Sequence, residues 1–311
     1  MEIIKNKIIA SLTNFKIGGE SKYFVYLERK EELDDFFNFY KNYLPLFILG
    51  GGTNILFDNF KGIVLKTNFK EWQIIDEGII KIGANFLISE ILEKLIELNY
   101  KGLEWAGGLP GELGGAIRGN AGCFGGEIKD LIIEVEAINL KTKEYRKFKK
   151  DEINFQYRDS FFKKDKNWLI ISALLKFEKI NDKNYLIKAI EEKINYRKEK
   201  HPIEYPNAGS IFKNIPLEKA SEKLKNLALE KNKIKNDPFP VIPTAFVISE
   251  LGLKGKKIGD AQISEKHANF IINLKRATFN DVYQLIDYVK KKVSDEFEVI
   301  LEEEIEIVKS Y

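Results

Sequence analysis

LEWAGGLPGELGGAIRGNAGCFGGEIKD, residues 103–130, is the segment on which the interpretation of the whole chain depends. Nine of its 28 residues are glycine, which leaves too few side chains for the face of a helix or a strand. Such a density of glycine is typical of backbone that takes positive φ or that another group approaches closely. Because successive bare N–H groups form a concave anion site, we expect a bulky anionic cofactor against this backbone. From this segment alone, tight turns over a core remain the alternative.

A second glycine-rich turn, GGGTN at residues 50–54, follows a short buried strand that we expect at residues 46–49. A strand that ends in glycines places backbone amides where they can face a phosphate. The turn lacks the G-x-G-x-x-G spacing, and no helical pattern follows it. A Rossmann dinucleotide site is therefore a poor fit.

The composition excludes several classes of protein. The 311 residues suffice for two or three domains, and 50 basic against 47 acidic residues leave a charge of +3 that is spread along the chain. This pattern does not suggest a nucleic-acid partner. One cysteine and two histidines exclude an internal disulfide framework, and we expect no metal site. Without a signal peptide or an apolar run of the ~20 residues of a membrane span, we expect a cytoplasmic protein with no membrane partner.

Hydrophobic periodicity predicts a mixture of strands and helices without internal repeats. Strands are expected at residues 23–27, 46–49, 63–66, 72–76, 79–83, 131–140, 168–177, 270–273 and 297–308. Helices are expected at residues 30–43, 85–99, 184–200, 217–235, 244–251 and 279–295, the last with a capping box of Thr278 and Asp281. Residues 155–160 and 207–214 read as turns.

Seven motifs follow one another along the chain. They are NFKIGG at 14–19, GGGTNIL at 50–56, GLPGELGGAIRGNAG at 108–122, YRDS at 157–160, NAGSIFKN at 207–214, AQISEKHANFIIN at 261–273 and LEEEIEI at 301–307. With these motifs the chain resembles the UDP-N-acetylenolpyruvoylglucosamine reductases, flavoenzymes of peptidoglycan synthesis. The resemblance implies an α+β fold: two FAD-binding subdomains of the vanillyl-alcohol-oxidase type and a C-terminal α+β substrate-binding domain. We expect these units at residues 1–60, 61–195 and 196–311.

The resemblance also implies a non-covalent FAD, held by the two glycine-rich segments, with NADPH as co-substrate. The cofactor-binding residues it implies are Gly50, Gly51, Gly52, Thr53, Asn54, Gly108, Pro110, Gly111, Gly114, Gly115, Ala116, Asn120, Ala121 and Gly122. Cys123 lies beside these residues in the sequence. We do not predict a flavin linkage there, because small buried cysteines are common.

The implied reaction converts UDP-N-acetylglucosamine enolpyruvate to UDP-N-acetylmuramate. Hydride addition to C3 builds negative charge on C2 and the adjoining carboxylate, so the site needs an acid and an electrostatic stabiliser. In this family a serine, an arginine and a glutamate serve these needs, and they fall on Ser210, Arg158 and Glu304. The family usually has proline between its two glutamates, and here Glu303 fills that place. Strand alternation favours Glu304, with Glu303 as the alternative.

For the UDP-sugar, the resemblance implies contacts from Lys200 and Asn214, with Tyr157 and Arg197 as weaker candidates, while His267 has no assigned role. Only 52 positions separate Arg158 from Ser210, too few for the tyrosine-bearing lid loop of one branch of the family. The lysine-rich residues 217–235 are interpreted as a surface insertion. We expect a monomer. The rival interpretations are another FAD-dependent oxidase or dehydrogenase of the same fold and a non-catalytic protein that binds flavin or a nucleotide sugar.

Overall fold

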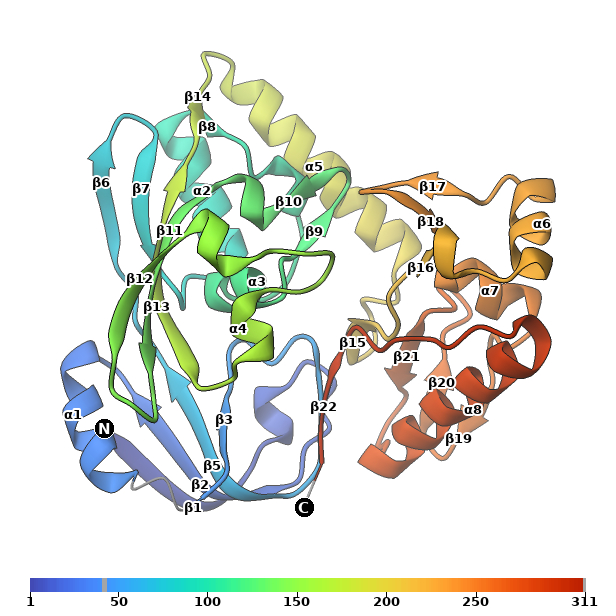
Figure 1. Cartoon of the computed structure of the whole chain (residues 1–311), viewed down its shortest axis with the longest axis horizontal. Coiled ribbons are helices and arrows are strands. Elements are labelled where there is room, and N and C mark those ends of the chain that lie inside the picture. The colour runs from blue at the N-terminus through green and yellow to red at the C-terminus, as the bar shows by residue number, and fades with distance from the viewer. Residues whose placement is uncertain (41–43, 310–311) are drawn as a thin grey trace.

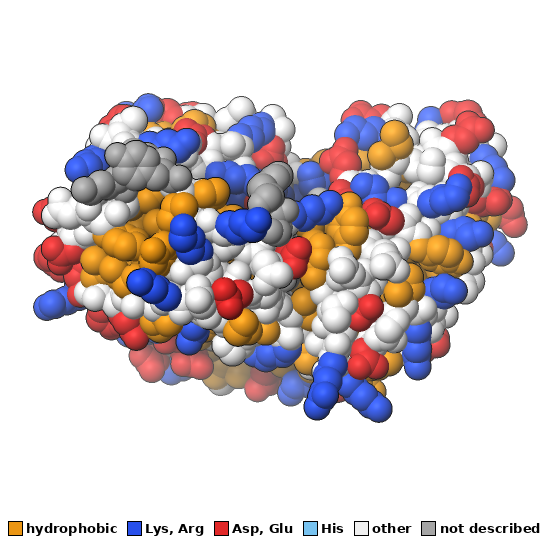
Figure 2. Space-filling model, turned by 90° about the horizontal axis from the view of Figure 1, so that it is seen from below, with side chains coloured by type: hydrophobic (Ala, Val, Ile, Leu, Met, Phe, Trp, Pro, Cys, Tyr) orange, Lys and Arg blue, Asp and Glu red, His pale blue; other side chains and the backbone are white. Residues whose placement is uncertain are grey.

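The computed structural model describes residues 1–40 and 44–309, and Figure 1 shows them as two lobes. The larger lobe carries the N-terminal and central parts of the chain, and the smaller lobe carries most of the chain after α5 (Lys183–Lys200). The last strand, β22 (Glu306–Val308), returns to the larger lobe, where it pairs in parallel with β4 (Ile55–Phe57). Seen from below in Figure 2, the surface has a notch between the lobes.

The first sheet has the strand order β1-β2-β5-β3. Its strands are β1 (Glu2–Ile8), β2 (Glu20–Leu27), β3 (Leu46–Ile48) and β5 (Phe60–Thr67). The pairs β2–β5 and β5–β3 are parallel, and β1 is antiparallel to β2. Both faces of β5 are buried, because Leu65 packs in the core with α1 (Leu33–Phe39) and Val64 in a second core that includes Phe57. This explains its nearly continuous apolar sequence.

The second sheet is antiparallel, in the order β12-β11-β13-β7-β6. Its strands are β6 (Trp72–Asp76), β7 (Ile79–Gly83), β11 (Ile132–Asn139), β12 (Tyr145–Lys149) and β13 (Trp168–Lys176). The apolar stripe of α2 (Ile88–Leu98) packs against this sheet. The same core contains Ile170 of β13 and Ile190 of α5. The neighbours of Ile170 on β13, Leu169 and Ile171, point to the opposite side and join the core of the first sheet. The central strand therefore holds the two sheets together.

The smaller lobe is built on the sheet β15-β21-β20-β19 and on two helices. Its elements are β15 (Asn207–Ser210), β19 (Lys257–Ile258), β20 (Ala261–Ile263), β21 (Phe270–Asn273), α7 (Thr244–Glu250) and α8 (Phe279–Phe297). Thr278 and Asp281 form the predicted capping box of α8. A second, small sheet in the order β16-β18-β17 accompanies α6. These elements are β16 (Ile215–Pro216), α6 (Glu222–Glu230), β17 (Lys235–Asn236) and β18 (Pro240–Ile242).

Short elements complete the structure. They are β8 (Tyr100–Lys101) with β14 (Glu178–Lys179), β9 (Gly122–Cys123) with β10 (Gly126–Glu127), α3 (Leu113–Arg118) and α4 (Phe161–Lys164). The helix α3 lies inside the glycine-rich segment, where the sequence predicted none, because Leu113 and Ile117 are both buried in the core of the second sheet. Two buried apolar residues one turn apart are therefore enough to hold this short helix in place.

Four other predictions need correction. The helix predicted at 30–43 ends at Phe39, since Tyr40 is extended, and its positions 41–43 lie outside the described residues. Residues 207–210 form β15 instead of a turn. Residues 297–308 are not one strand, because α8 continues to Phe297 and Glu298 has a φ of 56°. The segment 217–235 is not only a solvated helix, because α6 buries Leu224 and Ala228 in the core of the smaller lobe. The predicted domain boundaries stay a prediction.

Candidate active site

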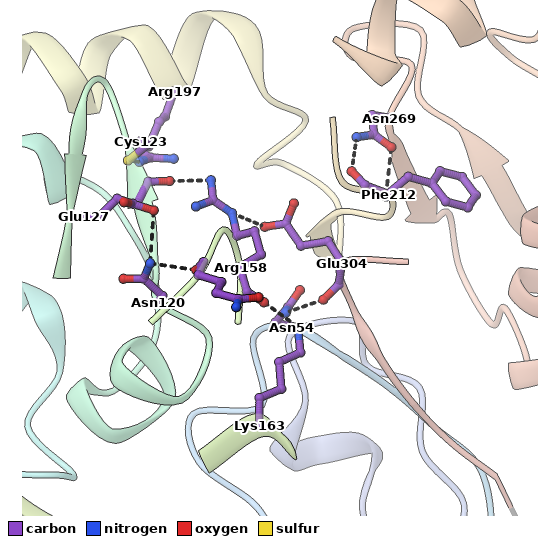
Figure 3. A network of polar contacts seen from close by, with 12 residues as sticks. Asn54, Asn120, Cys123, Glu127, Arg158, Lys163, Arg197, Phe212, Asn269 and Glu304 are labelled. Atoms are coloured by element: carbon purple, nitrogen blue, oxygen red, sulfur yellow. Dashed lines mark hydrogen bonds and ion pairs between the residues drawn. The ribbon is translucent and has the colours of Figure 1, made fainter. Parts of the chain in front are cut away.

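Arg158 is at the centre of a polar network between the two lobes (Figure 3). It lies in the tight turn closed by the Gln156–Asp159 bridge and has a φ of 54°, a conformation rare for a residue with a side chain. Its Nε donates to Glu304 Oε1 at 2.9 Å, and its Nη2 donates to the carbonyl oxygen of Gly122 at 2.5 Å. The structure therefore joins the YRDS, LEEEIEI and glycine-rich motifs at one side chain.

The charge of Arg158 is stabilised by its partner. Burial alone would lower the pKa of this guanidinium, but the charge of Glu304, the neighbouring Tyr157 and the hydrogen bond to Glu304 together outweigh burial and raise the pKa above its usual range. The guanidinium carbon also lies 5.0 Å from the centre of the Tyr157 ring. A permanently charged planar fork is thus held at the network's centre, which suits the recognition of a carboxylate.

Glu304 and Glu303 point to different places. The backbone N–H of Glu304 donates to the carbonyl of Ile211 at 2.8 Å, and its side chain reaches Arg158. Glu303 instead pairs with Lys290 of α8 at 2.8 Å. The residues are not in a regular strand, but the buried Leu301 on one side of them preserves the predicted alternation. The geometry therefore places Glu304, and not Glu303, at Arg158.

Ser210 is the last residue of β15 and pairs with Phe270 of β21. It directly precedes Ile211, whose carbonyl accepts the Glu304 N–H, so these two predicted residues are on adjacent backbone segments. The Ser210 side chain is half-buried, and the preceding Gly209 has a φ of 78° with no protein atom within 4 Å of the Cβ position. The backbone beside Ser210 is therefore open at the Cβ position of Gly209.

The GGGTN turn has the features of an anion site. None of the backbone N–H groups of residues 50–54 donates a hydrogen bond to another residue of the described chain. Gly51 lies against the other glycine-rich segment, where a Cβ would stand 3.1 Å from Gly111 Cα, and Thr53 Oγ1 is equally close to the Cβ position of Gly111. Asn54 Nδ2 donates to the Glu304 carbonyl at 3.1 Å, so the turn also contacts the catalytic candidates.

Lys66 and Glu112 join the two glycine-rich segments. Lys66 Nζ donates to the Gly50 carbonyl at 2.9 Å and pairs with Glu112 Oε1 at 3.0 Å. Asn85 Nδ2 donates to the other oxygen of the same carboxylate at 2.8 Å. The predicted convergence of the two segments is therefore present, and it rests on polar residues that the sequence analysis did not single out.

Most glycines of residues 103–130 are needed by the protein itself. A Cβ on Gly107 would stand 2.6 Å from the Ile190 carbonyl, and one on Gly126 would collide with the Trp105 ring. Gly108 and Gly114 are likewise close to protein atoms. The sequence argument that a cofactor presses on this whole backbone was therefore too broad.

Gly115 is different from these glycines. It is exposed, has no protein atom within 4 Å of its Cβ position and lacks a positive φ. Within the described chain its N–H also has no acceptor. Nothing in the described protein requires glycine here, whereas a bound group lying on the backbone would. The open face at Gly115 and the free amides of residues 50–54 therefore fit an anionic cofactor.

The other cofactor candidates divide into two groups. Asn120 is fully buried, and its Nδ2 donates to Glu127 Oε1 and to the Gln156 carbonyl, so it supports the Arg158 turn from behind. Ala116 is buried, while Ala121 is half-buried. Gly108 and Pro110, in the first part of the glycine-rich segment, are exposed.

The predicted substrate-binding residues do not all lie at Arg158. Tyr157 adjoins Arg158, and burial raises the pKa of its hydroxyl, so it stays neutral. Asn214 Oδ1 accepts the Thr244 N–H at 3.3 Å, at the start of α7. Lys200 lies in the exposed last turn of α5 and pairs with the adjacent Glu199 at 2.5 Å. The structure does not bring Lys200 into the network around Arg158.

Two cations in or near the site were missed from the sequence. Lys163 Nζ donates to the Arg158 carbonyl at 2.8 Å, and its pKa is lowered by burial and by the charges of Lys213 and Arg118 (Figure 3). Arg118 pairs with Glu306 at 2.8 Å. The signal was available, because Lys163 follows the YRDS motif closely and Arg118 lies within the glycine-rich motif.

Cys123 is held by Arg197, one of the weaker substrate candidates. Arg197 Nη2 lies 3.0 Å from Cys123 Sγ, and its Nε donates to the Gly107 carbonyl at 2.9 Å. Burial raises the pKa of the thiol although the positive charge of Arg197 opposes this. A neutral thiol is a weak nucleophile. Among the described residues, no cluster of three His, Cys, Asp or Glu could hold a metal, and no helix is long and apolar enough to cross a membrane.

Comparison with known proteins identifies the family. Residues 21–146 match the model of an FAD binding domain, and residues 201–308 match the model described as UDP-N-acetylenolpyruvoylglucosamine reductase, C-terminal domain. A UDP-N-acetylenolpyruvoylglucosamine reductase from Fusobacterium nucleatum is 36% identical to this chain, over 99% of this chain and 100% of that protein. The chain belongs to the UDP-N-acetylenolpyruvoylglucosamine reductase family. The reductase from Thermotoga maritima is 38% identical over 95% of both chains.

A solved structure agrees with this assignment. The UDP-N-acetylenolpyruvylglucosamine reductase from Thermus caldophilus superposes with a TM-score of 0.77 at 25% identity, covering 99% of this chain and 98% of that one. The predicted resemblance, the α+β fold with an FAD-binding region and a C-terminal domain, and the class of FAD-dependent oxidoreductase are thereby confirmed.

Proposed function

We propose that this reductase converts UDP-N-acetylglucosamine enolpyruvate to UDP-N-acetylmuramate, the lactyl ether used in peptidoglycan synthesis, with NADPH as the reductant. The observation that carries the proposal is the convergence of Arg158, Glu304 and the Ser210 backbone from three separate motifs. A reaction that builds charge on a carboxylate needs such a constellation.

FAD would be held by the free amides of residues 50–54 and by the open backbone at Gly115. When bound, it supplies hydride transfer from the nicotinamide to the enolpyruvyl carbon. The other predicted cofactor-binding residues of the two glycine-rich segments would line this cradle, with Asn120 acting from behind. The protein's task at this point is to hold and orient the cofactor toward Arg158.

Arg158 and Glu304 would stabilise the enolate-like intermediate on the substrate. Glu304 accepts the hydrogen bond of Arg158 Nε, and the Gly122 carbonyl accepts that of Nη2. Nη1 has no partner among the described residues. The guanidinium is thus fixed by two contacts while one nitrogen can donate to the substrate carboxylate. Glu304 contributes by keeping the fork charged and oriented.

Ser210 would donate the proton to C2. A serine hydroxyl is a very weak acid, so this step requires that the carbanion be a much stronger base than the alkoxide. The nearby cations Lys163, Lys213 and Arg118 favour negative charge in the site. Tyr157, Asn214 and Lys200 would contact the UDP-sugar, of which Lys200 has the least structural support.

The proposal is tested with purified, FAD-loaded protein. We expect NADPH to be oxidised rapidly only when the UDP-enolpyruvyl sugar is present. Rapid NADPH oxidation with oxygen alone would favour an oxidase of the same fold, and no oxidation with either acceptor would favour a non-catalytic binding protein.

We also propose that the enzyme works as a cytoplasmic monomer in cell-wall synthesis, without nucleic-acid or membrane partners. The even distribution of charge and the single cysteine support this setting. Light scattering coupled to size-exclusion chromatography tests the oligomeric state, and a mass of two chains would overturn that part.

A further inference from the structure

The lysine-rich residues 217–235, which had no predicted role, lead into a hairpin that reaches the other lobe. Strands β17 and β18 project from the smaller lobe toward the β9–β10 hairpin (Figure 1). The base of the hairpin is firmly held, because Val241 and Ile242 are fully buried and Ile242 pairs with Ile215 of β16. The hairpin tip, residues 237–239, is therefore carried by a packed support.

Two contacts join the hairpin tip to the larger lobe. The ring of Phe239 lies edge-on to the ring of Tyr157, with centroids 5.2 Å apart and an interplanar angle of 76°. Asp237 Oδ2 accepts the N–H of Gly125 at 3.2 Å, beside the β9–β10 turn. The second contact is exposed, and it joins the tip to the turn between β9 and β10.

The aromatic contact continues directly into the candidate active site. Tyr157 has Phe239 on one side and the Arg158 guanidinium 5.0 Å from its ring centre. Arg158 in turn pairs with Glu304. A displacement of Phe239 would free the Tyr157 ring to change rotamer and would remove one wall around the Arg158 fork.

We propose that Phe239 is a positioning residue of the substrate site, which acts by holding Tyr157 against Arg158. The hairpin that follows residues 217–235 thereby supplies an aromatic wall to a site that lacks the tyrosine-bearing loop. This inference rests on the proposed function, because it treats Tyr157 and Arg158 as residues that contact the UDP-sugar.

The test uses the FAD-loaded full chain and NADPH oxidation at varied concentrations of the UDP-enolpyruvyl sugar. Phe239→Ala should raise KM for the sugar by about three- to tenfold, within the range of an edge-to-face aromatic contact, and should change kcat by less than about twofold. Phe239→Tyr should restore the wild-type KM. The control is Leu229→Ala, which should leave both constants unchanged. Leu229 lies on α6 of the same lobe, and 64% of its surface is exposed.

A second variant separates positioning from simple bulk. Phe239→Leu keeps apolar volume but loses the ring edge, and should raise KM by about threefold or more. A wild-type KM in Phe239→Leu or in Phe239→Ala would overturn the inference. If the wild type itself does not oxidise NADPH with the sugar, the proposed function fails instead, so the two failures are distinguishable.

Discussion

Exchange of Glu304 for glutamine removes the negative charge that faces Arg158 but keeps an oxygen that can accept its hydrogen bond. The Arg158 and Glu304 side chains are only 19% and 23% exposed, so solvent screens their interaction weakly. A hydrogen bond between charged groups contributes about 1.5–3 kcal/mol. At about 2 kcal/mol, loss of the charge should slow the step that uses Arg158 by roughly 30-fold.

The assay separates the two half-reactions by stopped-flow absorbance of the flavin. In Glu304→Gln, reduction by NADPH should stay within about twofold of wild type, while reoxidation by the UDP-enolpyruvyl sugar should slow by the stated factor. The matched control is Glu303→Gln, which loses a part-buried ion pair with Lys290 and makes no contact with Arg158, so it should leave both steps unchanged. Equal slowing of reoxidation in both variants would refute the assignment of Glu304, as would a loss confined to the NADPH step.

Three further predictions concern the proton donor, the cofactor cradle and stability. Ser210→Ala should slow flavin reoxidation by roughly 10²-fold or more with near-normal reduction by NADPH, and equal damage to both half-reactions in stopped flow would count against an acid role. Gly115→Ala should not lower the melting temperature of the FAD-free protein, yet it should weaken FAD binding measured by fluorescence titration. Gly114→Ala should lower that melting temperature, because the added Cβ would stand 3.0 Å from the Cβ of Ala84. Unchanged FAD affinity in Gly115→Ala would contradict the proposed cofactor site at Gly115. Burial opposes ionisation of Glu136, but hydrogen bonds, first from Lys81, lower its pKa from 4.5 to about 2, so the stability it contributes is present above pH 4.5 and is lost as pH falls toward 2. The urea midpoint of the wild type should therefore fall more between pH 5 and 3 than that of Glu136→Gln, and parallel curves would exclude this linkage.

The register of the glutamates shows what alternation alone can predict. The sequence pattern predicted a strand at 297–308, which is wrong for most of that range, yet the choice of Glu304 for the Arg158 side agrees with the structure. Burial of Val299, Leu301 and Ile305 imposes the alternation without a regular ladder. Periodicity therefore reports which side faces the core more reliably than it reports hydrogen bonding.

Glycine density has the opposite limitation. It correctly indicates backbone that is closely approached, but it does not tell whether the approaching atom is Ile190 of the protein, as at Gly107, or a ligand, as proposed at Gly115. Lys163 and Phe239 were missed because their roles depend on tertiary contacts with Arg158 and Tyr157 that no local pattern encodes.

The most direct test of the account is a crystal structure of the FAD-loaded enzyme with the UDP-enolpyruvyl sugar. We expect the substrate carboxylate within hydrogen-bond distance of Arg158, with Ser210 Oγ beside C2 and Glu304 still paired to the guanidinium. A sugar bound with its enolpyruvyl group away from Arg158 and Ser210 would contradict the assigned chemistry, whatever the activity of the protein.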